Sequence, residues 1–459
     1  MDSPKPAPIS LTQKFVSGEL HFGLWGVVAR GIGIVNSLFI IKALTVYLYG
    51  VFQLFLSAYA IVTEFISWSG LAVGTEILRL VGRGDEAKAK RLFYEYNTLR
   101  LITAGIVWVI VFLGAPFALR SHPDFIGFTR IMSFMLFADL ISAMMGTIVQ
   151  MRLDFKALAS RRTIGKSFQV IILTGFFLFS KIGLKEVILS LAIRNFLTMA
   201  IFIPAAIRAW KPWRGLAAER GSSILWRVAR AHGKWDSVKN FLSQFINQIE
   251  PWLINIFIST AAVGIYGIAS QLAEVVMQVV PRNTMNSLIA RVFHDRERSK
   301  KVFTYAIKYL TLWGMMGMIG SVLTIPILIH VFLPQYIPAL PFFYLLLFAI
   351  PVKSFQWMTD LFLIIFRQQK FVFIRMLTRN ALLLGLLLVL LPTIGLWALP
   401  LAELFVRISV TFVGYRRLLK IRPELQITPR LIFSFGPEDR KILGNLFTHF
   451  KLFFRRFAI

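Results

Sequence analysis

Long apolar runs recur along the chain, and they constrain its fold more than any other feature. A run that crosses about 30 Å of hydrocarbon needs about 20 residues, and such runs recur from Leu20 almost to the C-terminus. The composition agrees, with 57% hydrophobic residues and a mean hydropathy of +0.68. Strand-like alternation is absent, and unpaired backbone groups are too costly in lipid for other solutions. We therefore predict an all-α integral membrane protein.

The apolar runs predict about twelve transmembrane helices. They lie near residues 20–44, 48–69, 98–118, 126–149, 165–181, 186–208, 236–258, 262–289, 304–333, 339–366, 371–391 and 395–415. The residues before Leu20 are polar and proline-rich, and the run that starts there is too long for the core of a signal peptide. No cleavable signal peptide is therefore expected.

The formal net charge of +29 follows the predicted topology. In a soluble protein such a charge would suggest nucleic acid as a partner. Here Lys and Arg gather in every second connection, while three of the opposite connections (7–8, 9–10 and 11–12) carry none. The positive-inside rule then places both termini and the cationic connections in the cytoplasm. Attraction to anionic membrane lipids accounts for the charge, so no nucleic-acid partner is predicted.

An internal repeat divides the chain into two halves. Tyr49-Gly50-Val51-Phe52 opens the second predicted helix, and Val263-Gly264-Ile265-Tyr266 opens the eighth. Two halves of six helices each must share one orientation, because six is even. The predicted fold is therefore two parallel six-helix repeats, related by an axis along the membrane normal as in other transporters.

This repeat sets the predicted domain organisation. It comprises a cytoplasmic tail at 1–19, an N-lobe at 20–209, a cytoplasmic inter-lobe loop at 210–234, a C-lobe at 235–416 and a basic tail at 417–459. The basic tail is predicted to form an amphipathic cytoplasmic helix with phenylalanine on its apolar side. We expect it to lie on the inner leaflet, or to dock a glycosyltransferase or polymerase of the same pathway.

Polar residues within the predicted helices form stripes. Helices 1, 2, 7 and 8, the repeat-equivalent first pairs, all carry one, and such residues are costly in lipid unless they face a cavity or a partner. Each stripe alone is explained by helix–helix hydrogen bonding, but together they favour a polar cleft between the halves. Glu403 and Arg407 are spaced i, i+4 and are predicted to pair with each other. Arg194 is likewise predicted to be structural.

The chain resembles the polysaccharide-lipid, or O-antigen-type, flippases of the multidrug/oligosaccharidyl-lipid/polysaccharide exporter superfamily. The helix openings Gly50-Val51-Phe52 and Gly264-Ile265-Tyr266 are similar to that family's Gly-aliphatic-aromatic pattern. Ile41-Lys42-Ala43-Leu44 stands where the family has an Ala-Arg-x-Leu-Gly motif, so this sequence departs from the pattern there. The resemblance implies V-shaped lobes that alternate in access, in a bacterial-type inner membrane. It also implies a lipid-linked oligosaccharide as cargo, for a surface polymer such as the O-antigen of lipopolysaccharide.

The residue types suit a polyprenyl-pyrophosphate-linked oligosaccharide. Three intramembrane cations, Arg30, Arg282 and Lys353, are candidates to bind the pyrophosphate by charge-assisted hydrogen bonds. Arg30 is the strongest of them, because it is a lone cation between glycines in the first helix. Candidates to bind sugar hydroxyls are Asn247, Gln248, Gln271 and Gln278.

Energy coupling is predicted to use an H⁺ or Na⁺ gradient. The chain has no Walker motif and no catalytic motif, so neither ATP hydrolysis nor enzyme activity is expected. The membrane-embedded carboxylates that are candidates to take up the ion are Asp139, Glu64, Glu250 and Glu274. With no cysteine and six scattered histidines, neither a metal site nor another cofactor is expected.

Three other functions remain open at this point. A multidrug or cation antiporter of the same superfamily would need an acidic, aromatic site with few fixed cations. A scramblase or structural assembly protein would transport without a gradient, or not at all. An enzyme that polymerises sugar lipids would need a large extracytoplasmic loop, and these loops are all short.

Overall fold

The computed structural model is helical throughout its described part. It describes residues 11–67, 70–118, 120, 124–152, 154–179, 182–217, 223–228, 234–278, 296–366, 368–428, 434 and 436. No strand occurs within these ranges. Arg282 and the predicted amphipathic helix of the basic tail lie outside them.

The long helices follow the predicted spans. Each of the twelve in these ranges overlaps one span: α1 (Leu11–Ala43), α2 (Val46–Ile66), α4 (Glu86–Ala118), α5 (Asp124–Met151), α6 (Phe155–Phe179), α7 (Leu184–Trp210), α9 (Lys234–Phe257), α10 (Thr260–Gln278), α12 (Arg296–Phe332), α13 (Leu340–Ile365), α14 (Gln369–Ile394) and α15 (Ala398–Ile421). Eight candidate spans in the described ranges are long and apolar enough to cross a membrane. Several helices extend beyond the apolar run, as α1 does before Leu20, because helical hydrogen bonding continues into the polar flanks.

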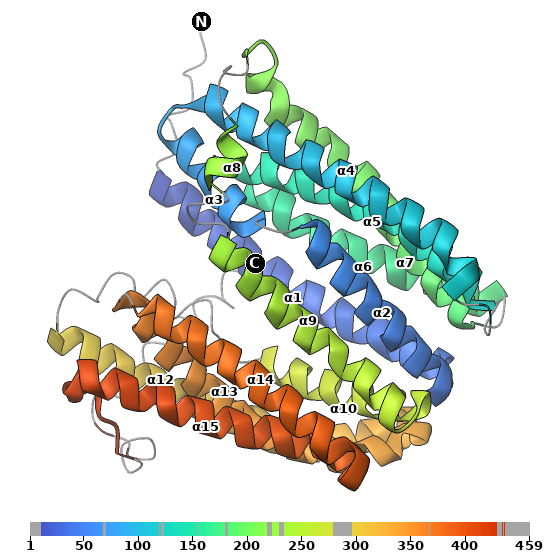
Figure 1. The fold of residues 1–459 in the computed structure, drawn as a ribbon, viewed down its shortest axis with the longest axis vertical. Helices are drawn as coiled ribbons and strands as arrows, with labels where there is room; N and C mark the ends of the chain where they lie inside the picture. The colour runs from blue at the N-terminus through green and yellow to red at the C-terminus, as the bar shows by residue number, and fades with distance from the viewer. Residues whose placement is uncertain are drawn as a thin grey trace, which may run out of the picture. The chain divides into compact units, whose positions relative to one another are not determined.

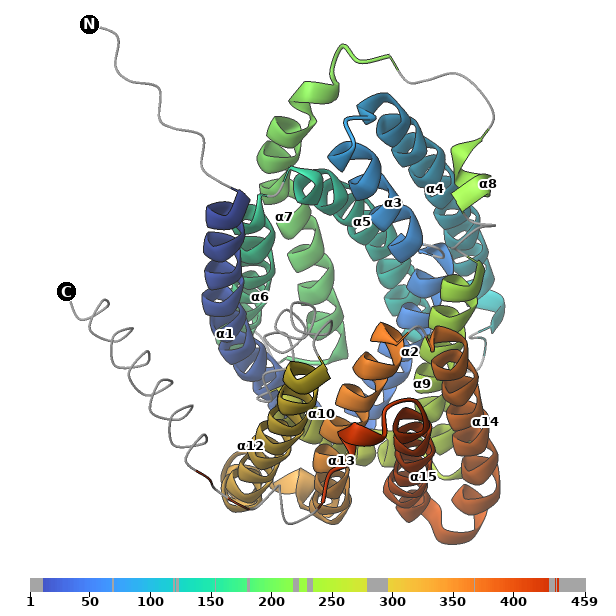
Figure 2. The ribbon, with the colours of Figure 1, turned by 90° about the vertical axis from the view of Figure 1, so that its left-hand side faces the viewer.

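Shorter helices occupy predicted connections or the first residues of predicted spans, as η4 does. They are α3 (Gly70–Gly82), α8 (Ile224–Val228), η1 (Lys211–Trp213), η3 (Pro334–Ala339), η4 (Gly395–Trp397) and η5 (Pro423–Leu425). The amphipathic α3 packs against α4 and α8 (Figure 2).

Exposed apolar stripes mark the faces of the helices that suit lipid. On α4, Ile102, Ile106, Ile110, Leu113 and Phe117 are each more than half exposed and lie at spacings of three or four residues. This spacing keeps them on one helical face. Such large exposed apolar surfaces are unstable in water, so the chain is a multi-pass membrane protein.

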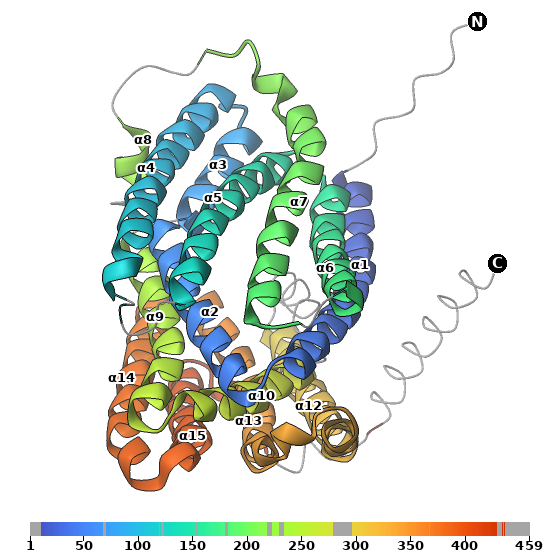
Figure 3. The same cartoon turned by 90° about the vertical axis from the view of Figure 1, so that its right-hand side faces the viewer.

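The chain divides into two compact units. The first comprises Met1–Ile268, Leu328–Ala339 and Leu387–Leu396, and the second comprises Ala269–Ile327, Leu340–Leu386 and Trp397–Ile459. In the first unit α6 lies between α1 and α7, and α5 packs along α7 (Figures 1 and 3). In the second unit α13 packs along α15. The lobe boundary in the loop at 210–234 stays a prediction.

Three of the cationic connections meet at one end of the first unit. Glu86 of α4 accepts hydrogen bonds from Arg152 in the α5–α6 connection, at 3.0 and 3.1 Å, and from the Trp213 indole at 2.8 Å. Lys90 donates to the carbonyl oxygens of Trp213 and Leu216, at 2.8 and 2.6 Å. A buried cluster around Trp213 and Phe93 joins α3, α4, α7 and α8 beneath these contacts. The predicted cationic loops of this half thus share one end, as the positive-inside topology requires.

Candidate functional site

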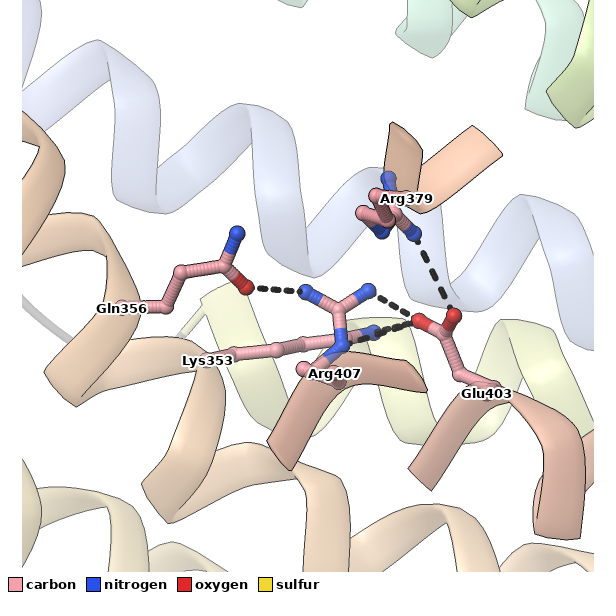
Figure 4. Close-up of polar contacts among 5 residues, drawn as sticks. All are labelled: Lys353, Gln356, Arg379, Glu403 and Arg407. Atoms are coloured by element: carbon pink, nitrogen blue, oxygen red, sulfur yellow. Dashed lines mark hydrogen bonds and ion pairs between the residues drawn. The ribbon is translucent and has the colours of Figure 1, made fainter. Parts of the chain in front are cut away.

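A cluster of charged side chains lies within the apolar helices of the second unit. Glu403 of α15 lies within ion-pair distance of three cations: Arg407 one turn along the same helix, Arg379 of α14 at 3.2 Å, and Lys353 of α13 at 4.0 Å. Arg407 also donates to the Gln356 side chain at 3.0 Å. Figure 4 shows all five side chains converging from three helices. We call these residues the Glu403 cluster.

The helical repeat explains how the Glu403 cluster is assembled. Glu403 and Arg407 are four residues apart, and Lys353 and Gln356 are three apart, so each pair shares a helical face. The packing of α13 on α15 brings these two faces together. Arg379 then reaches Glu403 from the neighbouring helix α14.

The Glu403 cluster carries more positive than negative charge. Three cations and one carboxylate leave a net charge of +2 within the cluster when all are ionised. The carboxylate of Glu274 on α10 also acts on Lys353, and the charge stays positive when Glu274 is included. The side chains are poorly hydrated, with exposed fractions of 15% for Glu403, 11% for Arg407 and 27% for Lys353. Excess charge at membrane depth is costly unless an opposite charge joins it. This arrangement is suited to bind an anion.

A neighbouring ion pair in the same unit is balanced and serves as a contrast. Arg375 of α14 pairs with Asp360 of α13. Arg375 is 5% exposed, and its guanidinium fills the space beside Gly414 where a side chain would otherwise stand. Lys353, Gln356 and Asp360 lie three and four residues apart along α13, but only the first two belong to the Glu403 cluster.

A second polar network lies inside the first unit. Asp139 of α5 accepts hydrogen bonds from the Tyr59 hydroxyl of α2 and, at 3.0 Å, from the Asn195 amide of α7. Arg194 donates to the Asn195 side-chain oxygen at 2.8 Å and to the Gln169 oxygen at 2.7 Å. We call these residues the Asp139 network.

The Asp139 network extends across the unit to α1. Gln169 of α6 accepts a further hydrogen bond at 2.6 Å from Asn36 of α1. The network thus links five helices, and it explains Arg194 as a partner of polar side chains within the bundle. Both donors to Asp139 suit an ionised carboxylate, and the positive charges of Arg194 and Arg161 act on it.

The other predicted residues are dispersed, except that the charge of Glu274 acts on Lys353. Arg30 lies exposed on α1, Asn247 is exposed on α9 and Glu274 is exposed on α10. Gln248, Glu250, Gln271 and Glu64 are half-buried. The carbonyl oxygen of Gln248 accepts a hydrogen bond from Ser57, which fastens α9 to α2. Gln278 ends α10, and its side chain, like all of Arg282, is outside the described set.

Metal binding has no visible site in the described residues. Within those ranges, no group of three or more His, Asp or Glu side chains is placed to hold a metal ion.

Residues 43–341 match the family model of a polysaccharide biosynthesis protein, which is more than half of the chain. The chain belongs to this polysaccharide biosynthesis family. No curated protein matches the sequence. The family match ends before Lys353, so the Glu403 cluster lies outside the matched residues, and its assembly from three helices is seen in the structure.

Solved structures similar to this family member are transporters. A multidrug resistance MATE family transporter of the MOP superfamily, inward-facing, aligns with a TM-score of 0.67 at 14% identity, over 87% of this chain and 98% of that one. An outward-facing structure of a multidrug resistance MATE family transporter of the MOP superfamily aligns with a TM-score of 0.60 at 13% identity, over 90% of this chain and 97% of that one. The MATE multidrug transporter DinF-BH aligns with a TM-score of 0.64 at 15% identity, over 93% of this chain and 100% of that one.

These likenesses establish the fold as twelve helices in two lobes, as in MATE transporters. The predicted superfamily and fold class are therefore confirmed. The protein is a membrane transporter of the MOP superfamily.

Sequence reasoning missed the most concentrated charge in this transporter. It expected Glu403 and Arg407 to pair, which is correct, but it assigned them no role and did not consider Arg379. A charge count was the available signal, because Arg379 of α14 and Arg407 of α15 lie within apolar runs in which Glu403 is the one carboxylate.

Proposed function

We propose that this polysaccharide biosynthesis protein flips a polyprenyl-pyrophosphate-linked oligosaccharide from the cytoplasmic to the outer leaflet. It would do so by alternating access in a bacterial-type inner membrane, with both termini in the cytoplasm. The observation that carries the proposal is the net charge of +2 in the Glu403 cluster. An unbalanced cationic site within apolar helices matches an anionic head group that must leave water to cross the membrane.

The pyrophosphate would bind Lys353, Arg379 and Arg407. Guanidinium and ammonium groups form short, charge-assisted hydrogen bonds to phosphate oxygens, and arginine binds them with two parallel donors. Arg30 and Arg282 remain candidates for the same group at other stages of transport. Asn247, Gln248, Gln271 and Gln278 remain candidates for the sugar hydroxyls.

The Glu403 cluster disfavours the multidrug or cation antiporter, which the MATE fold by itself would suggest. At an effective dielectric constant of 20, two like unit charges 4 Å apart repel by about 4 kcal/mol. A cationic drug at this cluster would meet more positive than negative charge. An anionic pyrophosphate at the same cluster would instead be attracted by the excess positive charge.

Coupling to an H⁺ or Na⁺ gradient would use the Asp139 network. Protonation of Asp139 would remove the charge that Arg194 balances, and it would weaken the acceptors for Tyr59 and Asn195. Glu64, Glu250 and Glu274 remain further coupling candidates.

The decisive test is mass spectrometry of lipids from cells that lack the protein, alongside analysis of their surface polymer. Accumulation of a polyprenyl-linked oligosaccharide and loss of one polysaccharide would support the proposal and name the cargo. An unchanged lipid pool together with new sensitivity to cationic dyes would reject it in favour of drug export.

A further inference from the structure

A cavity of about 370 Å³ opens between α6 and α7 of the first unit. Figure 3 shows these two helices side by side. The polar lining of the cavity includes Arg161 of α6 and Arg208 of α7, and the apolar lining includes Ile164, Ile201 and Phe202. The cavity contains no residue of the Glu403 cluster and none of the Asp139 network, although the charge of Arg161 also acts on Asp139. A volume of this size accommodates part of a small molecule.

The charge of the cavity is positive on balance. Arg161 lies 4.9 Å above the Phe202 ring, and one of its nitrogens donates to the Ser142 carbonyl oxygen at 3.0 Å. These contacts hold the guanidinium in one orientation within the lining. Arg208 is exposed in the last turn of α7. The single carboxylate in the lining, Asp154, accepts the Ala157 backbone N–H at 3.1 Å and so caps the start of α6.

The cavity lies at the end of the helices where the cationic connections meet. Arg152, in the α5–α6 connection, donates to the Ala209 carbonyl oxygen at 3.2 Å, one residue after Arg208. Under the proposed topology this end lies at the head-group level of the inner leaflet. Along the cavity, α7 presents apolar side chains to its surroundings, with Ile201 47% and Ile207 51% exposed.

We propose that this cavity binds the phosphate head group of an anionic glycerophospholipid of the inner leaflet. Arg161 and Arg208 bind the phosphate oxygens, and the acyl chains follow the exposed apolar surface around Ile201. The site is separate from that of the transported lipid. The proposal rests on the cytoplasmic topology of the proposed function but not on the identity of its cargo.

The test measures binding of phosphatidylglycerol and phosphatidylcholine to the purified full-length chain by native mass spectrometry. We expect the first phosphatidylglycerol to bind more tightly than phosphatidylcholine. Each basic residue near an anionic surface contributes about 1 kcal/mol, which is about fivefold in affinity. Arg208→Gln should therefore weaken phosphatidylglycerol binding about fivefold.

Two variants separate the site from general surface charge. Ala205→Trp fills the cavity without changing its charge, and it should also lower phosphatidylglycerol binding. Arg214→Gln removes an exposed arginine six residues further along the same connection, outside the cavity lining, and should leave binding unchanged. Arg161→Gln is less suited, because Arg161 also contacts Ser142 and Phe202.

Three outcomes would overturn the proposal. Equal binding of the two phospholipids would exclude recognition of the anion, and equal losses in Arg208→Gln and Arg214→Gln would show bulk attraction only. Displacement of phosphatidylglycerol by undecaprenyl pyrophosphate, one for one, would assign the cavity to the cargo. Cells that carry Arg208→Gln should keep a normal pool of lipid-linked sugar, so failure here is distinguishable from failure of the proposed function.

Discussion

Gly50 of α2 and Gly264 of α10 lie directly against each other where these two helices cross. A Cβ atom on Gly50 would overlap the Thr260 carbonyl oxygen and lie 3.1 Å from Gly264 N. A Cβ atom on Gly264 would overlap the Val46 carbonyl oxygen and lie 3.2 Å from Gly50 N. Val46 and Thr260 each precede their glycine by four residues, so the contact is reciprocal. The repeat that the sequence suggested is thus a symmetric contact in space.

The starts of the two helices repeat the same relationship. Thr45 caps α2 by accepting the Leu48 backbone N–H at 3.3 Å, and Ser259 accepts the Ala262 N–H at 3.2 Å at the start of α10. Hydroxyl side chains at this position satisfy backbone donors that the first turn leaves unpaired. Equivalent caps place the two glycines at equivalent depths along their helices.

Replacing either crossing glycine should destabilise the protein. In Gly50→Ala and Gly264→Ala the new methyl group forces two backbones apart, which we expect to cost about 1–3 kcal/mol. The measurement is the thermal midpoint of the detergent-purified protein. Gly105→Ala in α4 is the control, because nothing lies within 4 Å of a Cβ there. Equal midpoints for Gly50→Ala and Gly105→Ala would contradict the close approach.

Removing one cation from the Glu403 cluster should weaken anion binding. In Lys353→Met the net charge falls from +2 to +1, and we expect about tenfold weaker binding of undecaprenyl pyrophosphate, or about 1.4 kcal/mol. Calorimetric titration in detergent measures this. Lys42→Met, at the exposed end of α1, is the matched control. Unchanged affinity in Lys353→Met would remove Lys353 from the proposed site.

Removing the Glu403 carboxylate should strengthen anion binding, and it should reduce stability more than Lys353→Met does. Glu403→Gln leaves three cations without a balancing charge, and we expect a loss of about 3 kcal/mol or more. An added pyrophosphate lipid should then raise the thermal midpoint more in Glu403→Gln than in the wild type, because binding stabilises the folded state. A smaller ligand-induced shift in the variant would contradict an anion site.

Asp139→Asn tests gradient coupling. The substitution keeps the shape of the side chain but removes its charge, so flipping in proteoliposomes should lose its dependence on an imposed H⁺ or Na⁺ gradient. Glu76→Gln in α3 is the control, because Glu76 pairs with the exposed Arg79 and lies outside the network. If flipping by Asp139→Asn depends on the gradient as strongly as flipping by the wild type, the Asp139 network has a purely structural role.

Lys90 should hold the segment after α7 in place. Its two hydrogen bonds to the Trp213 and Leu216 carbonyl oxygens are lost in Lys90→Met, so the segment should open more often and be cut faster by trypsin after Arg214. Lys88→Met, whose side chain is 44% exposed and pairs only loosely with Asp85 at 3.9 Å, is the control. Equal cleavage rates in both variants would show that Lys90 does not anchor the segment.

The sequence by itself determined the class of protein, the approximate helices and the repeat. Apolar runs and the distribution of Lys and Arg are local properties, and lipid permits few structures for them. The pairing of Glu403 with Arg407 was equally local, because the helical repeat puts residues four apart on one face. The helices α3 and α8 escaped notice because both are too short to cross a membrane and lie between predicted spans.

Only the tertiary structure decided which polar residues meet. Arg379 and Lys353 reach Glu403 from two other helices, and Asp139 meets Tyr59 and Asn195 from two more. Periodicity places each side chain on a face of its own helix, but it leaves open which face of another helix lies opposite. That choice depends on how all the helices pack together, and so the site with the greatest excess of charge became visible only in the folded chain.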